Sequence, residues 1–424
     1  METNSAWDWN TGEKMIADIN QWKDKFNWVE EIHASPDGEK AAGIVNLSEG
    51  EFSVCVNGES WENVFDKIWY PRFSPDGRLT ALVSEMGAWT VAVDAEPWDE
   101  KFAYVWNTLF SRDGKTVAVA FQQDMQYGMA VNGTPWENTF MNMTGMALSP
   151  DGKNTAATVQ TVPFGEGEIF KFQEGAFSVA VDGNAWDKNF VNIWNSAFSA
   201  DGKTVASDVR LNLYDYTIAV NGVCWKNIFD CVWEPAINPL NSQVIAPVRV
   251  KGKWTLAKDG TIMWGSRFNQ LWHQAFSPDG KRVAAIVSPK YGKWTVAVDG
   301  IPWNIRFGEL VTDLVFSNDS SSTAAVVKDN GKWTVAVDGS VWNKMFDMAW
   351  KPVFSPRGGH VAARVEVNGK YSISLNGRMC EKSGEFAWDP VFSPDGDKIL
   401  VRMLENGKYY RRVLPVEEFI QKGR

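Results

Sequence analysis

Few residues in this chain have side chains suited to catalysis or to binding a transition metal. Its 424 residues include three histidines and four cysteines, and none of these lies at the spacing of a zinc site or a C-x-x-C redox pair. The nucleophile elbow G-x-S-x-G and the phosphate-binding P-loop are also absent from the sequence. We therefore predict no catalytic residue and no metal ligand, so the chain is expected not to be an enzyme. The histidines and cysteines are His33, His273, His360, Cys55, Cys224, Cys231 and Cys380.

Repeated Asp-Gly pairs could suggest calcium binding or glycosidase chemistry. In a sialidase Asp box, however, one residue separates Asp from Gly and a Trp follows three residues after the Gly. Here Gly follows Asp directly, as at Asp279-Gly280. The alternating Asp and Asn residues of an EF-hand, with their terminal Glu, are also missing. Because an Asp side chain accepts a hydrogen bond from the backbone two residues further on, these pairs predict turns.

The turns belong to a repeat that runs through the whole sequence. Its anchor is an apolar residue followed by Ser-Pro-Asp-Gly, and successive anchors are 37 to 40 residues apart except for one gap of 50. Such a period indicates an array of small structural units that cannot bury their apolar faces alone. The ten anchors begin at Ser35, Ser74, Ser111, Ser149, Ser199, Asn238, Ser277, Ser317, Ser355 and Ser393.

The sequence of each unit predicts four β-strands. In the unit around Ser277, residues 271–276 form a first strand, and Pro-Asp-Gly then turns the chain. The apolar run 283–287 is typical of a strand covered on both faces. Residues 294–298 are rich in β-branched residues, and Asp299-Gly300 is a hairpin signal that leads into a short edge segment.

Four strands in about 39 residues, repeated without helical periodicity, predict an all-β β-propeller of about ten four-stranded, WD40/TolB-like blades. We predict a propeller at residues 22–414, an N-terminal arm at 1–21 and a C-terminal tail at 415–424. The last unit supplies only three clear strands, so the N-terminal segment is expected to close a single ring by completing that blade. Two five-bladed rings are the alternative.

Most of the 23 tryptophans recur at equivalent repeat positions, which predicts that they pack in the core. Those at the fourth-strand position are Trp22, Trp61, Trp98, Trp136, Trp186, Trp225, Trp264, Trp303 and Trp342. Those five residues before an anchor are Trp69, Trp106, Trp194, Trp233, Trp272, Trp350 and Trp388. Those that start a third strand are Trp89, Trp254, Trp294 and Trp333.

Charge and hydropathy exclude several classes of protein. With 42 basic and 52 acidic residues the formal net charge is −10, which disfavours a nucleic-acid-binding protein. The N-terminus lacks the basic and apolar regions of a signal peptide, and no segment approaches the ~20 apolar residues needed to cross a bilayer. We expect a cytoplasmic protein that reaches the membrane only through partner subunits.

Departures from the repeat are where a partner is expected to bind. The 50-residue gap holds an insertion, residues 161–172, that contains Phe164, Ile169, Phe170 and Phe172. These apolar side chains either fold onto the blade or dock a partner. The N-terminal arm offers Trp7 and Trp9 as two further candidate partner-binding residues.

The units Phe276-Ser277-Pro278-Asp279-Gly280-Lys281 and Phe392-Ser393-Pro394-Asp395-Gly396 resemble the WD40-like repeats of TolB-type propellers. This resemblance covers the chain from about Trp22 to Leu414, and it implies a fold that proteins of many functions share.

A more specific resemblance lies in Gly-Lys-Trp-Thr-Val-Ala-Val-Asp-Gly followed by Trp, at Gly292 to Trp303 and again at Gly331 to Trp342. This pattern is similar to that of the tryptophan-rich cytoplasmic subunits of transmembrane cytochrome (Tmc) redox complexes of sulfate-reducing bacteria. The resemblance implies a cofactor-free subunit with two partners, a membrane cytochrome b and an iron–sulfur subunit. No binding residues are carried over, because the matching motifs form the blades.

Three functions remain open from the sequence. The first is a non-catalytic scaffold on the cytoplasmic side of a membrane-bound electron-transfer complex, where it docks the iron–sulfur subunit. The second is a ligand-binding or hydrolytic propeller that uses its central channel. The third is a free-standing interaction hub without a redox partner.

Overall fold

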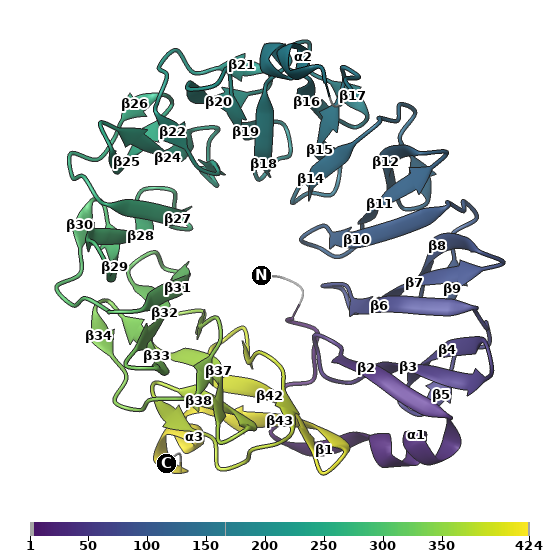
Figure 1. The fold of residues 1–424 in the computed structure, drawn as a ribbon. Coiled ribbons are helices and arrows are strands. Elements are labelled where there is room, and N and C mark those ends of the chain that lie inside the picture. Colours follow the sequence, from purple (N-terminus) through teal and green to yellow (C-terminus); the bar gives the residue numbers. More distant parts are fainter. Residues whose placement is uncertain (1–3, 166, 423–424) are drawn as a thin grey trace. The chain divides into compact units, whose positions relative to one another are not determined.

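The computed structural model describes residues 4–165 and 167–422, and side-chain surroundings as far as residue 419. Ten antiparallel sheets follow one another along the chain as the blades of a β-propeller, which confirms the predicted fold class (Figure 1). Blades 1 to 9 follow the chain from residue 28 to residue 379, and blade 10 combines residues from both ends. In three blades a break divides the first strand into two short pieces.

The first strands carry the residues that precede the Ser anchors. In blade order they are β2 (Trp28–Ala34), β6 (Lys67–Phe73), β10 (Tyr104–Phe110), β14 (Met143–Leu148), β18 (Asn192–Phe198), β22 (Cys231–Val232) with β23 (Ala236–Ile237), β27 (Gln270–Phe276), β31 (Leu310–Phe316), β35 (Met348–Ala349) with β36 (Val353–Phe354), and β40 (Phe386–Ala387) with β41 (Val391–Phe392).

The second strands are the apolar runs, and they are almost fully buried because sheets cover both of their faces. They are β3 (Ala41–Ser48), β7 (Leu79–Glu85), β11 (Val117–Gln123), β15 (Thr155–Gln160), β19 (Val205–Arg210), β24 (Val244–Val250), β28 (Val283–Lys290), β32 (Thr323–Asp329), β37 (Val361–Val367) and β42 (Lys398–Glu405).

The third strands pair with the second strands across the turn that joins them. They are β4 (Glu51–Val56), β8 (Ala88–Val93), β12 (Gln126–Val131), β16 (Phe177–Val181), β20 (Tyr216–Val220), β25 (Lys253–Lys258), β29 (Lys293–Val298), β33 (Lys332–Val337), β38 (Lys370–Leu375) and β43 (Lys408–Pro415).

The fourth strands are short in blades 1 to 9, and β1 (Gly12–Asp18) takes this place in blade 10. The others are β5 (Glu59–Ser60), β9 (Glu96–Pro97), β13 (Thr134–Pro135), β17 (Asn184–Ala185), β21 (Val223–Cys224), β26 (Thr261–Ile262), β30 (Ile301–Pro302), β34 (Ser340–Val341) and β39 (Arg378–Met379). Three short helices complete the elements: α1 (Ile19–Lys25), α2 (Ile169–Glu174) and α3 (Val416–Lys422).

The chain divides into two compact units, and each is described by itself. One contains Met1–Phe73, Gly77–Ala81 and Ser277–Arg424, and the other contains Ser74–Asp76 and Leu82–Phe276. Within each unit the core lies between consecutive sheets. Phe102 and Val105, for example, pack with Val91 of blade 2 and Val119 of blade 3.

The Ser-Pro-Asp-Gly motifs and their weaker copies, such as Ser111-Arg112-Asp113-Gly114, form turns, as predicted. The Ser111 hydroxyl donates to Asp113 at 2.6 Å, and Asp113 also accepts the Lys115 backbone N–H at 3.1 Å. These hydrogen bonds lower the pKa of Asp113, with the bond from Ser111 as the largest cause. The hairpin turn at Asp299-Gly300 uses positive φ angles of 51° and 80°, which favours glycine at the second position.

The N-terminal segment completes blade 10, which confirms the predicted closure. β1 pairs antiparallel with β43 from Gly12 opposite Val413 to Asp18 opposite Lys408, and Figure 1 shows the two strands side by side. The structure differs from the sequence interpretation in two respects. The closing strand, residues 12–18, comes from the segment assigned to the N-terminal arm at 1–21. Residues 22–26 resemble a fourth-strand segment, yet residues 19–25 form α1 because the Asp18 side chain caps the Asn20 N–H.

Buried polar side chains of blade 10 also form hydrogen bonds with the first turn of blade 1. The Tyr409 hydroxyl donates to the Gly38 carbonyl oxygen at 3.0 Å, and the Arg402 guanidinium donates to the Ser35 carbonyl oxygen at 2.7 Å. Nε of Arg411 donates to the Asp37 carbonyl oxygen at 2.8 Å. Arg402 and Arg411 stand where blade 7 has Ile286 and Val296, so two core positions of the repeat have become polar contacts between the last and first blades.

Candidate docking surface

One end of each blade carries the turn between its second and third strands. In blade 3, Tyr104 at the start of β10 pairs with Gln122 near the end of β11, and Gln123 pairs with Gln126 at the start of β12. The start of the first strand therefore lies beside the turn between the second and third strands. We call this end of the blade its turn end.

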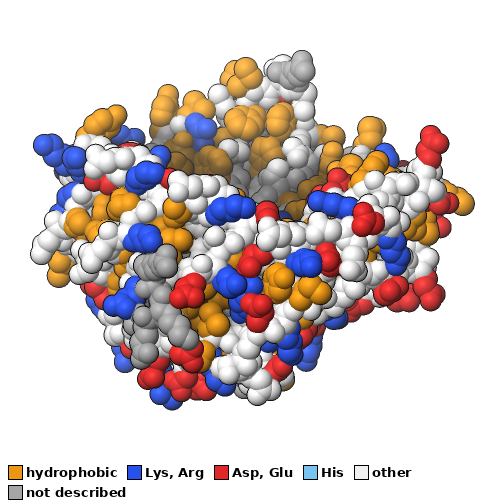
Figure 2. Space-filling model, turned by 90° about the horizontal axis from the view of Figure 1, so that it is seen from below, with side chains coloured by type: hydrophobic (Ala, Val, Ile, Leu, Met, Phe, Trp, Pro, Cys, Tyr) orange, Lys and Arg blue, Asp and Glu red, His pale blue; other side chains and the backbone are white. Residues whose placement is uncertain are grey.

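Within the unit that contains Leu82–Phe276, the turn ends of blades 2 to 5 carry exposed apolar side chains. The exposed fractions are 94% for Met86 in blade 2, 79% for Met125 in blade 3, 79% for Phe170 in blade 4 and 78% for Tyr214 in blade 5. In Figure 2 hydrophobic side chains project along the upper edge of the view, while charged side chains are mixed over its lower part. We call these four residues, with Ile169, the apolar turn surface.

The same turn is polar in most other blades. The residues before the turn glycine, at the position of Met86, are Glu49, Lys251, Asn330, Asn368 and Asn406, and Tyr291 of blade 7 is the apolar exception. Met125 follows Asp124 and stands where those turns have glycine. A left-handed turn residue is most easily Asn, Asp or Gly, yet Met86 and Met125 hold positive φ angles of 51° and 58°. Turn geometry alone therefore does not explain two methionines at these positions.

The blade 4 insertion divides into a packed part and an exposed part. The ring centroids of Phe164 and Phe172 lie 5.8 Å apart and 6.2 and 6.4 Å from that of Phe177 in β16, so these two side chains pack onto the blade. Ile169 and Phe170 begin α2 and are 60% and 79% exposed. Phe164 and Phe172 thus fold onto the blade, whereas Ile169 and Phe170 are exposed to solvent.

The blade 5 turn is held in place by its own polar groups. The Asn212 side chain accepts the N–H groups of Tyr214 and Asp215 at 2.9 and 3.0 Å. Arg210 donates to the Asn212 and Leu213 carbonyl oxygens at 3.0 and 2.7 Å. Because the turn is fixed in this way, Tyr214 is presented at a defined place.

Aromatic rings near these turns are also exposed. Trp194 is 41% exposed and stacks on Tyr216, with ring centroids 6.1 Å apart. Trp233 is 44% exposed and stacks on Trp254 at 5.4 Å. The prediction that tryptophans at repeat positions are core residues is therefore wrong for Trp69, Trp194 and Trp233, because neighbouring side chains leave 44%, 41% and 44% of these residues exposed to solvent.

Trp7 and Trp9 of the arm lie in the other unit and are half-buried. Their rings stack with centroids 6.1 Å apart, and the Trp9 indole N–H donates to the Asn4 carbonyl oxygen at 2.9 Å. Lys398 of blade 10 donates to the Trp9 carbonyl oxygen at 2.9 Å. These contacts fasten the arm to blade 10.

Two of the three histidines, His33 and His360, belong to the unit that does not contain the apolar turn surface. Burial lowers the pKa of His33 to about 4, with Arg72 as a second cause. His360 Nδ1 is 2.9 Å from the Asn376 amide, and His273 lies 3.8 Å from Glu234. Among the residues that the structure describes, no group of three or more His, Cys, Asp or Glu side chains is placed to hold a metal ion.

Asp208 is a buried acid that the repeat does not predict. It is 1% exposed and accepts the Asn195 backbone N–H at 2.9 Å. Burial raises its pKa to about 6, and the nearby Glu234 adds to the shift. Blades 1, 7 and 8 have Ile44, Ile286 and Val326 at the corresponding position, so Asp208 replaces an apolar core residue.

Because the pKa of Asp208 is raised in the folded protein, its contribution to stability is present below pH ~4 and is lost as pH rises through about 6. Asp208→Asn keeps an oxygen that can accept the Asn195 N–H but carries no charge. We expect this variant to be more stable than the native protein at pH 8, by up to about 3 kcal/mol, and equally stable at pH 4. Urea unfolding at both pH values tests this. Equal stability at pH 8 would contradict the buried charge.

The sequence alone indicated Ile169 and Phe170 through their insertion but missed Met86, Met125 and Tyr214. An alignment of the turn residues across the ten repeats carries the missing signal, because apolar residues in four consecutive blades contrast with mostly polar ones elsewhere. In the described part of the chain, no helix is both long enough and apolar enough to cross a membrane.

No protein-family model and no curated protein matches the chain in sequence. A solved structure described as "Crystal structure of the eukaryotic initiation factor" aligns with 76% of this chain and 91% of that chain, at 13% identity and a TM-score of 0.47. Structural similarity of this degree carries no argument about function.

Proposed function

We propose that this chain is a non-catalytic propeller scaffold that docks a protein partner on its apolar turn surface. The exposed apolar side chains on four consecutive blades carry this proposal. A propeller fold suggests an interaction or scaffold role, because its repeated turns present a broad surface. Methionine and aromatic residues are also enriched where proteins bind one another.

The partner we propose is an iron–sulfur subunit of a membrane-bound electron-transfer complex. A membrane cytochrome b would then hold this chain at the cytoplasmic side of the inner membrane. The Gly-Lys-Trp-Thr-Val-Ala-Val-Asp-Gly repeats similar to those of Tmc subunits support this proposal. In such an assembly the chain itself binds no cofactor and fixes the position of its neighbour.

Mild detergent purification of the tagged protein from its native cells tests the proposal. We expect co-eluting subunits identified by mass spectrometry, with haem and iron–sulfur absorption in the visible spectrum. A colourless monomer without partners would contradict the redox assignment, and it would direct attention to a ligand-binding or hydrolytic propeller.

Phe170→Asp tests the docking surface itself. The side chain is 79% exposed, so folding and the melting temperature are expected to change little, while a desolvated carboxylate should weaken partner binding at least about tenfold. Tyr291→Asp is the matched control, because Tyr291 is 92% exposed at the same turn of blade 7. Equal loss of partner from both variants, or from neither, would contradict the proposed surface.

A further inference from the structure

Blade 9 lacks the tryptophan that the other nine blades place at the fourth-strand position. Blade 8 runs Asp338-Gly339-Ser340-Val341-Trp342, and blade 9 runs Asn376-Gly377-Arg378-Met379-Cys380. Blade 10 receives its tryptophan from the N-terminal segment as Trp22 in α1. Cys380 therefore stands where every other blade has an indole ring.

The surface that normally covers this ring is missing as well. Trp303 of blade 7 lies against Gly339 in the hairpin turn of blade 8, and Trp342 lies against Gly377 of blade 9 in the same way. Blade 10 has no such turn, because β43 runs on to Pro415 and leads into α3. Both halves of the repeated Trp–Gly contact are thus absent between blades 9 and 10.

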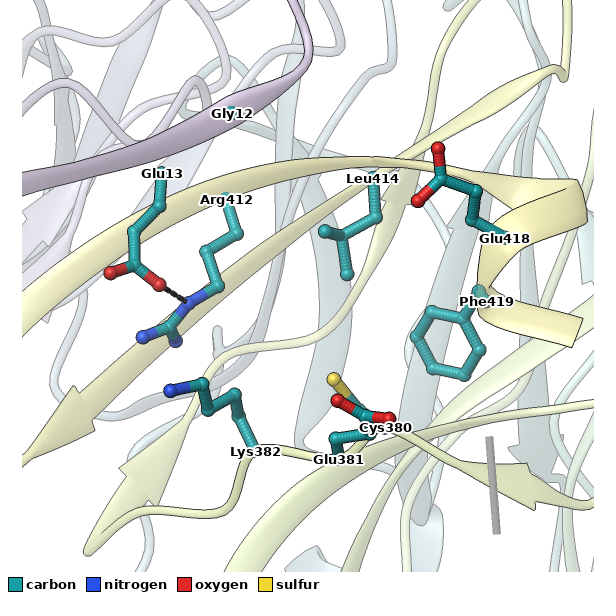
Figure 3. Close-up of a pocket in the computed structure, with 9 residues that line it drawn as sticks. All are labelled: Gly12, Glu13, Cys380, Glu381, Lys382, Arg412, Leu414, Glu418 and Phe419. Carbon is teal, nitrogen blue, oxygen red and sulfur yellow. Dashed lines mark hydrogen bonds and ion pairs between the residues drawn. The ribbon is translucent and has the colours of Figure 1, made fainter. Parts of the chain in front are cut away.

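A pocket of about 330 Å³ lies at this place (Figure 3). Its apolar side is formed by Cys380, Leu414 and Phe419, which also pack against the blade 10 core. Phe419 is 5% exposed and fills part of the space that the Trp ring and the Gly turn occupy between other blades. The rest of this space is open beside Gly12 of β1. A cavity of about 150 Å³ left by a truncated core side chain is enough to bind benzene, so this pocket has room for a larger ring.

The charges around the pocket disfavour an anionic ligand. Arg412 is 3% exposed and is paired with Glu13 at 2.5 Å and with Glu405, so two carboxylates already compensate its charge. Lys382, Glu381 and Glu418 add one positive and two negative charges to the lining, so that with Arg412, Glu13 and Glu405 the groups around the pocket carry a net charge of −2. Burial raises the pKa of the Cys380 thiol, so it stays protonated at neutral pH and is suited to contact an aromatic ring.

We propose that this pocket binds a small, neutral, planar aromatic molecule of about the size of indole, in the place that a tryptophan ring occupies in the other nine blades. Neither the fold nor the proposed docking function requires such a ligand. The pocket lies in the unit that does not contain the apolar turn surface, so the two proposals can fail separately.

Indole itself is the probe for the first test. We expect calorimetric titration to show saturable binding of indole to the native protein and the same binding to Cys380→Ser, which keeps the pocket open. Cys380→Trp places the indole ring of the repeat in the pocket. It is expected to weaken indole binding at least about tenfold and to raise the melting temperature. Absence of saturable binding to the native protein, or undiminished binding to Cys380→Trp, would overturn the proposal.

A second measurement on the native protein remains informative if Cys380→Trp does not fold. Indole in the pocket should slow alkylation of Cys380 by iodoacetamide at least about tenfold, followed by peptide mass spectrometry. Cys224, half-buried in the other unit, is the internal control and should react at an unchanged rate. Equal rates at Cys380 with and without saturating indole would show that indole does not enter this pocket.

Discussion

Trp303→Ala is expected to destabilise the protein by about 3–5 kcal/mol, as large-to-small aromatic changes in cores do. Trp303 is 9% exposed, lies over Gly339 of the next blade and is tied by its backbone N–H to the Val296 carbonyl oxygen at 2.8 Å. Alanine would leave a cavity between blades 7 and 8 that the rigid hairpin turn cannot fill. Urea unfolding followed by circular dichroism measures the loss.

Trp194→Ala is the matched control for this prediction. Its ring is also at a repeat position and stacks on Tyr216, but the residue is 41% exposed. We expect its truncation to cost no more than about 1 kcal/mol. If Trp303→Ala left the unfolding midpoint unchanged, or if both variants lost the same stability, the distinction between core and surface tryptophans would be wrong.

The blade architecture was predictable because each unit repeats the same local signals. Asp299-Gly300 predicts a hairpin turn, residues 283–287 predict a buried strand, and Ser277 marks the turn between the first two strands. These local preferences agree with the global fold in most of the units, so even the degenerate anchor at Asn238 was found. The closing strand was predictable from the missing fourth strand of blade 10.

The features that the sequence did not predict depend on contacts between segments far apart in the chain. Arg402 and Arg411 are buried because the blade 1 turn supplies carbonyl oxygens to their guanidinium groups. Such pairing is not visible from the residues around either arginine, and the pair Arg411-Arg412 by itself indicates only a small basic patch. Phe419 lies in the segment 415–424, which was predicted to be a tail because it follows the last repeat. Its side chain nevertheless packs against the blade 10 core.

The candidate docking surface was predictable only where it interrupts the repeat. The insertion interrupts the repeat and so indicates Phe170 as a candidate. The repeat period itself contains no information about which turn residues are exposed and apolar. Trp194 and Trp233 illustrate the opposite error, because recurrence at a repeat position predicts a core residue whether or not a neighbour covers the outer face of the ring. Burial of these rings is decided by blade-to-blade contacts, which the local sequence does not specify.

The largest loss of stability is expected when strand β1 is removed. Deletion of residues 1–18 leaves β43 as an open edge, since every partner of β43 from Lys408 to Val413 on that side belongs to β1. It also removes Glu13 and so leaves the buried Arg412 with one carboxylate fewer. We expect a loss of at least about 5 kcal/mol, or a protein that aggregates through the exposed edge.

Deletion of residues 1–9 distinguishes the contribution of strand β1 from that of the residues that precede it. It removes Trp7, Trp9 and the Asp8 carbonyl oxygen that accepts from Arg411 but retains β1 and its pairing with β43. The hydrogen bonds of residues 4–9, the stacking of Trp7 on Trp9 and the exposed Asp8–Lys14 ion pair are lost, so a cost of about 1–3 kcal/mol is expected. Size-exclusion chromatography and thermal unfolding of both truncations measure the difference. If removing residues 1–18 cost no more than removing residues 1–9, blade 10 would be stable with three strands, and the N-terminal strand would not be what closes the fold.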